Sequence, residues 1–298
     1  MGALVRTWIS RDRSFDVRSA LLPATERADP ARSAPRRRPL TIENARGERL
    51  AASLDLPAQD EPVGAALLAH CFTCSKDLRG IRHVAGALSE AGFAVLRLDF
   101  TGLGGSEGDF AETTFSTNVS DVLAAHEALT EALSLPQLFV GHSLGGAAVL
   151  AAALQRPEVR AVATIAAPDD PSHVVELLGE RLAGLEEEGS ATVDIGGRPF
   201  TITRQFVKDL RDSDLPDALV ELERPVLVLH SPSDRTVPIE QAERLYAAAR
   251  QPKSFVALEG ASHLLDDRRD AAYAGGVIAA WAKRYVLEDE NSDTGSAG

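Results

Sequence analysis

The sequence has few of the features that mark secreted, membrane-bound or metal-binding proteins. Its 298 residues include only two cysteines, too few for a framework of disulfides. No apolar run approaches the roughly 18 residues that a membrane span needs. The opening "MGALVRTWISRDR" is interrupted by arginines, so we expect no secretory leader. These absences together predict a cytoplasmic protein that does not act at a membrane.

Positive charge is scarce outside the N-terminus. The whole chain carries −13, but residues 1–38 hold nine arginines against four acidic residues, a net of +5 that leaves −18 for the rest. An acidic body disfavours nucleic acid, because phosphates require clustered cations. Residues 1–38 show no apolar stripe that could be buried, so we predict a disordered extension there. We predict the same for the acidic tail, residues 287–298.

Strand-like and helix-like patterns alternate along the rest of the chain. The runs "GAALLAH" (64–70), "FAVLRLDF" (93–100) and "QLFVGHS" (137–143) are short and apolar, typical of strands buried on both faces. Helical patterns follow them. This order predicts the α/β class, with a mostly parallel central sheet, helices on both faces and an antiparallel start over residues 40–57. We expect one domain over residues 39–286.

The stretch "GHSLG" (141–145) fits the motif G-x-S-x-G in the context that the motif requires. An apolar strand leads into it and a helix rich in small residues follows it. A sharp strand-to-helix turn would expose the Ser143 hydroxyl at the sheet edge, and the flanking glycines would allow close approach of the backbone. Ser143 is therefore predicted to be a nucleophile.

A serine hydroxyl needs a base, and the base needs a carboxylate to orient it. Asp234 and His263 each follow an apolar strand, which places them at the same sheet edge as Ser143. The order Ser, Asp, His is the one expected on this kind of fold. His142 adjoins Ser143 too closely to act as its base and is predicted to have a supporting role. This chemistry requires no cofactor and no metal.

On these residues, the chain resembles the α/β-hydrolase superfamily over roughly residues 40–286. Members of that family carry a loop of the type His-Gly-Phe-Thr-Gly near the nucleophile, and here the matching residues read His70-Cys71-Phe72-Thr73-Cys74. The resemblance implies that the backbone N–H groups of Phe72 and Leu144 bind the oxyanion and that His70 braces the loop. Cysteine in place of both glycines implies that neither position needs a positive φ.

A finer resemblance rests on "HCFTCSKD" together with "DFTGLGGSEGDF" (99–110). This combination is similar to the hydrolase half of proteins in which an α/β-hydrolase is fused to an OsmC-like domain. Because the chain ends soon after the last expected helix, we expect no OsmC-like part and carry over no peroxide-reducing activity. The glycines of the second stretch do not match a dinucleotide-binding motif, since Glu107 occupies its third glycine position.

Cys71 and Cys74 form a CxxC pair, for which three interpretations remain. We expect the two side chains to pack and shape the loop. The alternative is a reversible disulfide that would distort the oxyanion hole. A zinc site is disfavoured, because four-coordinate zinc needs two more ligands and the sequence has no further cysteine.

Between two strand-like stretches lies an insertion, residues 169–224, that a sheet does not require. Its length is typical of a lid. Residues 171–188 are helix-like with one apolar face, residues 191–203 read as a hairpin with Gly196 and Gly197 at its tip, and residues 204–210 read as a second helix. A similar small cap is known in esterases of hydroxycinnamoyl esters, but here its only aromatic residues are Phe200 and Phe206, with no Tyr or Trp to hold a phenolic ring. A scaffolding cap and a substrate-specific cap both remain open, and we expect a modest apolar acyl or alkyl pocket beneath it.

The sequence therefore predicts a serine esterase that acts on small to medium acyl esters through an acyl-enzyme, with a small-molecule ester as its partner and a monomer or homodimer as its state. One alternative is a perhydrolase or acyltransferase that uses the same three residues. Another is a non-catalytic binding or redox-sensing module on the same fold.

Overall fold

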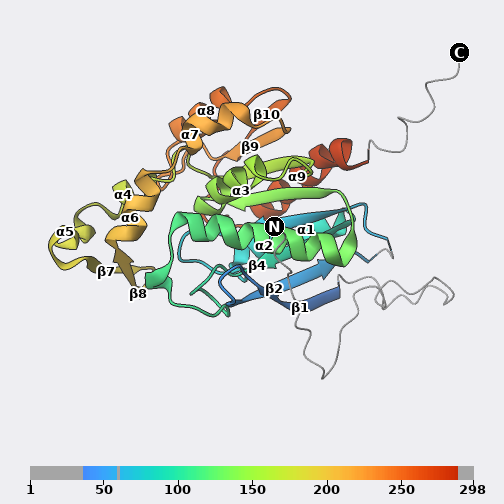
Figure 1. Cartoon of the computed structure of the whole chain (residues 1–298). Coiled ribbons are helices and arrows are strands. Elements are labelled where there is room, and N and C mark those ends of the chain that lie inside the picture. Colours follow the sequence, from blue (N-terminus) through green and yellow to red (C-terminus); the bar gives the residue numbers. More distant parts are fainter. Residues whose placement is uncertain (1–35, 59–60, 288–298) are drawn as a thin grey trace, which may run out of the picture.

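The computed structural model describes residues 36–58 and 61–287; the predictions for residues 1–35 and 288–298 lie outside this part. The described part contains an eight-stranded sheet in the order β1-β2-β4-β3-β5-β6-β9-β10 (Figure 1). Strands β1, β2 and β4 pair antiparallel, and all pairs from β4 to β10 are parallel. The predicted class and antiparallel start are thus confirmed. The strands are β1 (Arg36–Glu43), β2 (Arg49–Leu56), β3 (Gly64–Ala69), β4 (Phe93–Leu98), β5 (Gln137–His142), β6 (Ala161–Ile165), β9 (Val226–His230) and β10 (Lys253–Ala257).

Helices cover both faces of the sheet, and each layer encloses its own apolar cluster. On one face, α1 and α9 pack against the apolar side chains that β3, β4 and β5 direct toward them. On the other face, α2, α3 and α8 cover the alternate side chains of the same strands. The helices outside the insertion are α1 (Arg79–Glu90), α2 (Phe115–Leu133), α3 (Leu144–Leu154), α8 (Ile239–Ala248) and α9 (Arg268–Val286), with the short 3-10 helix η3 (Phe110–Glu112) before α2.

The strands at the centre of the sheet are buried along their whole length. Every residue of β3, β4 and β5 is buried, which explains why these stretches are mostly apolar and show no alternation. Because the strands from β4 to β10 are parallel, their carboxyl ends meet at one edge. The loops that follow β3, β5, β9 and β10 therefore gather there, and these loops carry the predicted site residues.

The first strand begins earlier than expected. Arg36, Arg37 and Arg38, placed in the disordered extension by their composition, lie in β1 and pair with the end of β2. The Arg37 guanidinium donates to the buried Asp55 carboxylate at 2.7 Å. The expectation failed because β1 is an edge strand whose register depends on pairing with β2, and a run of arginines carries no apolar signal.

The insertion, residues 169–224, lies between β6 and β9 and extends beyond one end of the sheet (Figure 1). Its hairpin is confirmed, with Gly196 and Gly197 at positive φ in the turn, as a two-residue turn between twisted strands requires. Its elements are α4 (His173–Leu178), η4 (Gly179–Leu182), α5 (Leu185–Glu188), β7 (Ser190–Ile195), β8 (Arg198–Thr203), α6 (Arg204–Arg211), α7 (Leu215–Ala218) and η5 (Leu219–Glu221).

The single helix predicted over residues 171–188 is wrong. Gly179 and Gly184 adopt positive φ and divide this stretch into α4, η4 and α5. Its apolar residues therefore do not share one face: Val174 and Leu185 are buried, whereas Leu177 is 41% exposed. The spacing of the apolar residues matched a helix. The two glycines nevertheless interrupt the helix, because glycine adopts a turn conformation easily where tertiary contacts favour one.

Candidate active site

Ser143 lies at the sharp turn between β5 and α3. Its backbone adopts φ 54° and ψ −127°, a strained conformation for a residue with a side chain. Such strain persists only where the surroundings enforce it. The Ser143 N–H donates to the Ile165 carbonyl of β6 at 2.9 Å, which ties the turn to the neighbouring strand. The structure thus places Ser143 at the carboxyl edge of the sheet.

Three glycines allow the turn to pack this closely. A Cβ atom on Gly145 would lie 2.2 Å from the His70 carbonyl oxygen, and one on Gly141 would lie 2.3 Å from the Gly145 carbonyl oxygen. A Cβ on Gly146 would lie 2.5 Å from the Cβ of Ala167. Close approach of the backbone therefore requires glycine here, as the sequence motif predicted.

The structure brings Ser143, His263 and Asp234 into one hydrogen-bonded chain. His263 Nδ1 lies 2.8 Å from Asp234 Oδ2, and His263 Nε2 lies 3.1 Å from Ser143 Oγ. Because a carboxylate can only accept, Nδ1 carries the ring proton and Nε2 is left to accept the serine proton. This arrangement suits removal of a proton from the Ser143 hydroxyl.

Asp234 is held as a carboxylate. Burial by itself would raise its pKa, but the hydrogen bond and charge of His263, together with the backbone N–H groups of Val237 and Thr236, lower the pKa below its usual value. Both amides donate to Oδ1, at 3.0 and 2.8 Å. One carboxylate oxygen is thus fixed by the backbone while the other faces His263.

His142 holds the backbone of His263, the predicted base. Its Nε2–H donates to the carbonyl oxygen of His263 at 2.6 Å, and the two rings lie 5.1 Å apart. Within the described residues, its Nδ1 atom is buried and has no partner. Burial, and next the charge of the neighbouring His263, lower the pKa of His142 to about 3, so the ring stays neutral. This position agrees with a supporting role rather than that of a base.

The loop after β3, residues 70–74, is a tight turn beside α3. The Cys74 N–H donates to the Cys71 carbonyl oxygen at 3.2 Å, and Thr73 adopts a φ of 59°. Neither cysteine has a positive φ, which confirms that these positions do not need glycine. The N–H of Phe72 has no acceptor among the described residues. The N–H of Leu144, the first residue of α3, has none there either, as is usual at the start of a helix.

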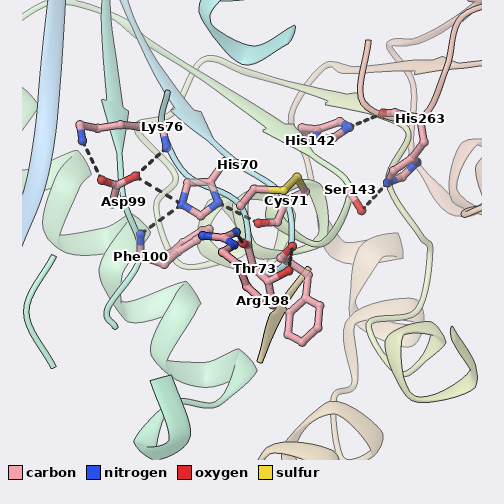
Figure 2. The surroundings of a disulfide bond; sticks show 12 residues. His70, Cys71, Thr73, Lys76, Asp99, Phe100, His142, Ser143, Arg198 and His263 are labelled. Carbon is pink, nitrogen blue, oxygen red and sulfur yellow. Dashed lines mark hydrogen bonds and ion pairs between the residues drawn. A yellow bond between two sulfur atoms is a disulfide. The ribbon is translucent and has the colours of Figure 1, made fainter. Parts of the chain in front are cut away.

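His70 is buried behind this turn and contacts its backbone directly (Figure 2). Its Nε2 atom accepts the Phe100 N–H at 3.3 Å, so its Nδ1–H is the donor to the Cys71 carbonyl oxygen at 2.7 Å. Burial lowers the pKa of His70 and keeps the ring neutral. The ring can therefore brace the loop.

Cys71 and Cys74 are joined by a disulfide (Figure 2). The expectation that two thiols merely pack is therefore wrong, and the alternative of a disulfide describes the structure. The turn brings the two Cα atoms within 5.4 Å, inside the range that a disulfide can bridge. The turn geometry that decides the matter is not visible in the spacing.

Two polar residues that sequence reasoning missed fix the ends of this loop. The buried Asp99 carboxylate accepts from the Lys76 backbone N–H at 2.6 Å, from Lys76 Nζ at 2.7 Å and from the Gly105 N–H at 2.9 Å. From the insertion, Arg198 Nη2 donates to the Thr73 carbonyl oxygen at 2.6 Å. Asp99 opens the glycine-rich stretch of residues 99–110, in which the acidic residue itself gave no signal. No sequence signal links Arg198 to a loop so distant in the chain.

Aromatic side chains join the insertion to the loop region. Phe72 stacks on Phe206 with ring centroids 5.5 Å apart, and Phe110 lies 5.1 Å from Phe200 and 5.8 Å from Phe72. Beside them, a cavity of about 10 Å³ is enclosed between the loop, Phe110 and Leu144. Such a cavity holds about one water molecule.

Residues 36–58 and 61–287 contain no group of three or more His, Cys, Asp or Glu side chains arranged to hold a metal ion. No helix in the same part of the chain is long and apolar enough to cross a membrane.

Comparison with known proteins places this fold in a family. The family profile described as the α/β hydrolase fold matches residues 66–194. The esterase domain of a Rhodothermus marinus protein is 51% identical, with a TM-score of 0.71 over 84% of this chain and 99% of that one. The chain therefore belongs to the α/β hydrolase family, and its structural neighbours include esterases.

More distant relatives have other names. The mitochondrial palmitoyl-protein thioesterase ABHD10 of Mus musculus is 32% identical over 56% of this chain and 58% of its own. The chain thus spans little more than half the length of that curated relative. The Est1E protein of Butyrivibrio proteoclasticus, solved with ferulic acid, is 23% identical with a TM-score of 0.74 over 84% of this chain and 100% of that one. At this identity the likeness shows the fold alone.

Proposed function

We propose that this protein is a serine esterase (EC 3.1.1) that hydrolyses small to medium acyl esters. The observation that carries the proposal is the hydrogen-bonded chain from Asp234 through His263 to Ser143. It lies where strand ends converge in the α/β hydrolase fold. The esterase domain that is 51% identical supports the same reaction class.

In this mechanism, Ser143 Oγ attacks the ester carbonyl while His263 Nε2 takes its proton. His263 then returns the proton to the leaving alcohol, and water hydrolyses the acyl-enzyme by the same route. Asp234 keeps His263 oriented and stabilises its charged form. The N–H groups of Phe72 and Leu144, which have no acceptor among the described residues, would bind the oxyanion.

The insertion would act as a lid that sets the acyl specificity. The aromatic side chains Phe72, Phe110, Phe200 and Phe206 meet where the insertion covers the loop. A cavity of about 10 Å³ adjoins Phe72 and Phe110, and a wider, more open hollow of about 520 Å³ is lined by Phe110, Phe200 and Gly108. The apolar side chains gathered there favour an alkyl or acyl chain over a charged group.

The test is hydrolysis of p-nitrophenyl esters from acetate to dodecanoate by the wild type and by Ser143→Ala. We expect the variant to lose about a thousandfold or more in kcat, because the residual rate rests on binding alone. Ser254→Ala, on edge strand β10, is the matched control and should retain wild-type activity. Equal rates for the wild type and Ser143→Ala on every ester would overturn the proposal.

Hydrolysis of thioesters is a second candidate, because a relative that is 32% identical is named as a palmitoyl-protein thioesterase. The same residues would serve, with a thiol as the leaving group. Comparing matched oxygen and sulfur esters of one acyl chain would separate the two. A kcat/KM more than about tenfold higher for the thioester would favour this candidate. The likeness to hydrolases fused to an OsmC-like domain and the cytoplasmic location stay predictions.

A further inference from the structure

The peptide group between Cys71 and Phe72 is held from its carbonyl side. The Cys71 carbonyl oxygen accepts two hydrogen bonds, from His70 Nδ1 at 2.7 Å and from the Cys74 N–H at 3.2 Å. A peptide group is planar and trans, so the N–H of Phe72 points in the direction opposite to that carbonyl. Groups that hold the carbonyl therefore also aim the N–H.

The disulfide closes this same turn. It links residues 71 and 74, the two residues that the Cys74 N–H hydrogen bond also joins (Figure 2). The hydrogen bond alone is long, and Thr73 at φ 59° opposes the turn, because a residue with a Cβ disfavours that conformation. A covalent link between the ends of the turn keeps it closed despite this opposition.

The neighbouring backbone is already fixed by other contacts. Before the turn, His70 directly follows β3, and after it Lys76 is tied to the buried Asp99 carboxylate by its N–H at 2.6 Å and its Nζ at 2.7 Å. Between them, residues 71–75 are held by the His70 ring at the Cys71 carbonyl oxygen, by Arg198 at the Thr73 carbonyl oxygen and by the disulfide. The disulfide therefore acts on the segment that contains the Phe72 amide.

From these contacts we infer that the Cys71–Cys74 disulfide is a positioning element of the oxyanion hole, so that its reduction lowers the rate of the chemical step. The inference rests on the proposed function. The bridge touches no reacting atom and acts through the orientation of the Phe72 N–H. Reduction should affect transition-state binding more than substrate binding, because the oxyanion forms only in the transition state.

Reduction requires a dithiol, which supplies two electrons and two protons. Its thiolate attacks the Cys74 sulfur, the more accessible of the two, since Cys71 is only 3% exposed. The Sγ–Sγ bond breaks through a mixed disulfide. The second thiol of the reagent then displaces Cys74, so that both cysteines become thiols and the reagent closes to a cyclic disulfide.

The experiment compares oxidised and dithiothreitol-reduced full-length protein. Because the chain has only two cysteines, alkylation followed by mass spectrometry reports the state of this bridge directly. We expect kcat for p-nitrophenyl butyrate to fall about tenfold on reduction with KM unchanged. The loss is smaller than the roughly 10²–10³ for complete removal of such a donor, because the Phe72 N–H is retained but less well aimed.

A double variant, C71S/C74S, separates the bridge from other effects of the reductant. It should match the reduced wild type in kcat and should not respond to dithiothreitol. A trifluoromethyl ketone, which forms a tetrahedral adduct with the serine, should bind less tightly to both by a similar factor. A thermal unfolding scan shows whether both forms remain folded at the assay temperature.

Three results would overturn the inference: no bridge in protein purified under oxidising conditions, an unchanged kcat after complete reduction, or a rise in KM alone. A fluorophosphonate that reacts with activated serines distinguishes this failure from failure of the proposed function. Labelling of Ser143 at equal rates with and without the bridge would overturn only the inference. An absence of both labelling and hydrolysis would overturn the proposed function, and the inference with it.

Discussion

Two turns on neighbouring strands meet at the candidate site, the turn after β5 that contains Ser143 and the loop after β3, and they are held in place by different means. The turn after β5 is fixed by its own backbone, since added Cβ atoms at Gly141 and Gly145 would come within 2.3 Å and 2.2 Å of backbone oxygens. The loop after β3 is fixed by side chains, through His70, the disulfide and Arg198. The first turn is therefore rigid by its local sequence, whereas the second depends on groups that can be reduced or moved.

The two turns have different tasks in the proposed mechanism. The nucleophile needs one fixed position in every step, which steric constraint provides. In the proposed mechanism the loop after β3 binds the substrate beside the insertion, and contacts from the insertion reach it through Arg198 and Phe206. Attachment by a few side chains allows this loop to respond to the insertion.

The largest effect should come from a variant that leaves both turns intact and disorients the base. Asp234→Asn removes the charge that fixes the proton on His263 Nδ1, so kcat should fall about 10³- to 10⁴-fold. The measurement is kcat on a p-nitrophenyl ester at neutral pH, with thermal unfolding as a check of the fold. A loss of less than about tenfold would contradict the role given to Asp234.

Breaking the turn after β5 should cost stability as well as activity. In Gly145→Ala, the new Cβ would lie 2.2 Å from the His70 carbonyl oxygen, so we expect a loss of about 3 kcal/mol or more in the free energy of unfolding. Gly86→Ala in α1 is the matched control, because nothing lies within 4 Å of its Cβ. The control should be neutral or stabilising by up to about 1 kcal/mol. Urea unfolding compares the two, and similar stabilities would contradict the steric account.

The buried histidine of the same turn should make stability depend on pH. The pKa of His142 is lowered to about 3, so between that value and its ordinary pKa of about 6.5 the unfolded state binds more protons. The stability that neutral His142 contributes is fully present above pH 6.5 and is lost as the pH falls. The free energy of unfolding should drop by about 2 kcal/mol between pH 7 and pH 5.

The check is urea unfolding of the wild type and of His142→Gln at both pH values. Between pH 7 and pH 5, the variant should lose about 2 kcal/mol less of its free energy of unfolding than the wild type. The reason is that glutamine does not titrate, while it can still donate to the His263 carbonyl oxygen. His70 and His230, whose pKa values are also lowered chiefly by burial, contribute in the same direction in both proteins. Identical pH dependence of the two proteins would refute the assignment to His142.

The smallest effect should come from loosening the loop after β3 from the insertion. Arg198→Ala removes the hydrogen bond to the Thr73 carbonyl oxygen, which is 2.6 Å long but made by an exposed arginine. A contribution of about 1 kcal/mol corresponds to a change of roughly fivefold in kcat/KM. Arg204→Ala, whose guanidinium contacts the Glu186 carbonyl oxygen within the insertion, is the control and should change little. Equal effects of the two would show that Arg198 does not act through the loop.

Much of the site could be predicted because its signals are local. The motif around Ser143 requires glycines at positions that adjoin the serine in sequence, and Asp234 and His263 each follow a recognisable strand. Burial of the central strands removed their alternation, which is itself a readable pattern. The edge strand β1, by contrast, depends on pairing with β2, and its arginines gave no such pattern.

By itself, the sequence determined the α/β class, the order of strands and helices and the turn at Ser143, because these follow from backbone sterics and from apolar periodicity over short distances. Only the tertiary structure decided that Cys71 and Cys74 are bonded, that Arg198 reaches Thr73 and that the helical stretch of the insertion is broken. The physical reason is that these outcomes depend on which segments meet in space. A turn must first bring the sulfur atoms of Cys71 and Cys74 together before the disulfide can form. Likewise, the insertion must bring Arg198 to the Thr73 carbonyl oxygen before that hydrogen bond can form.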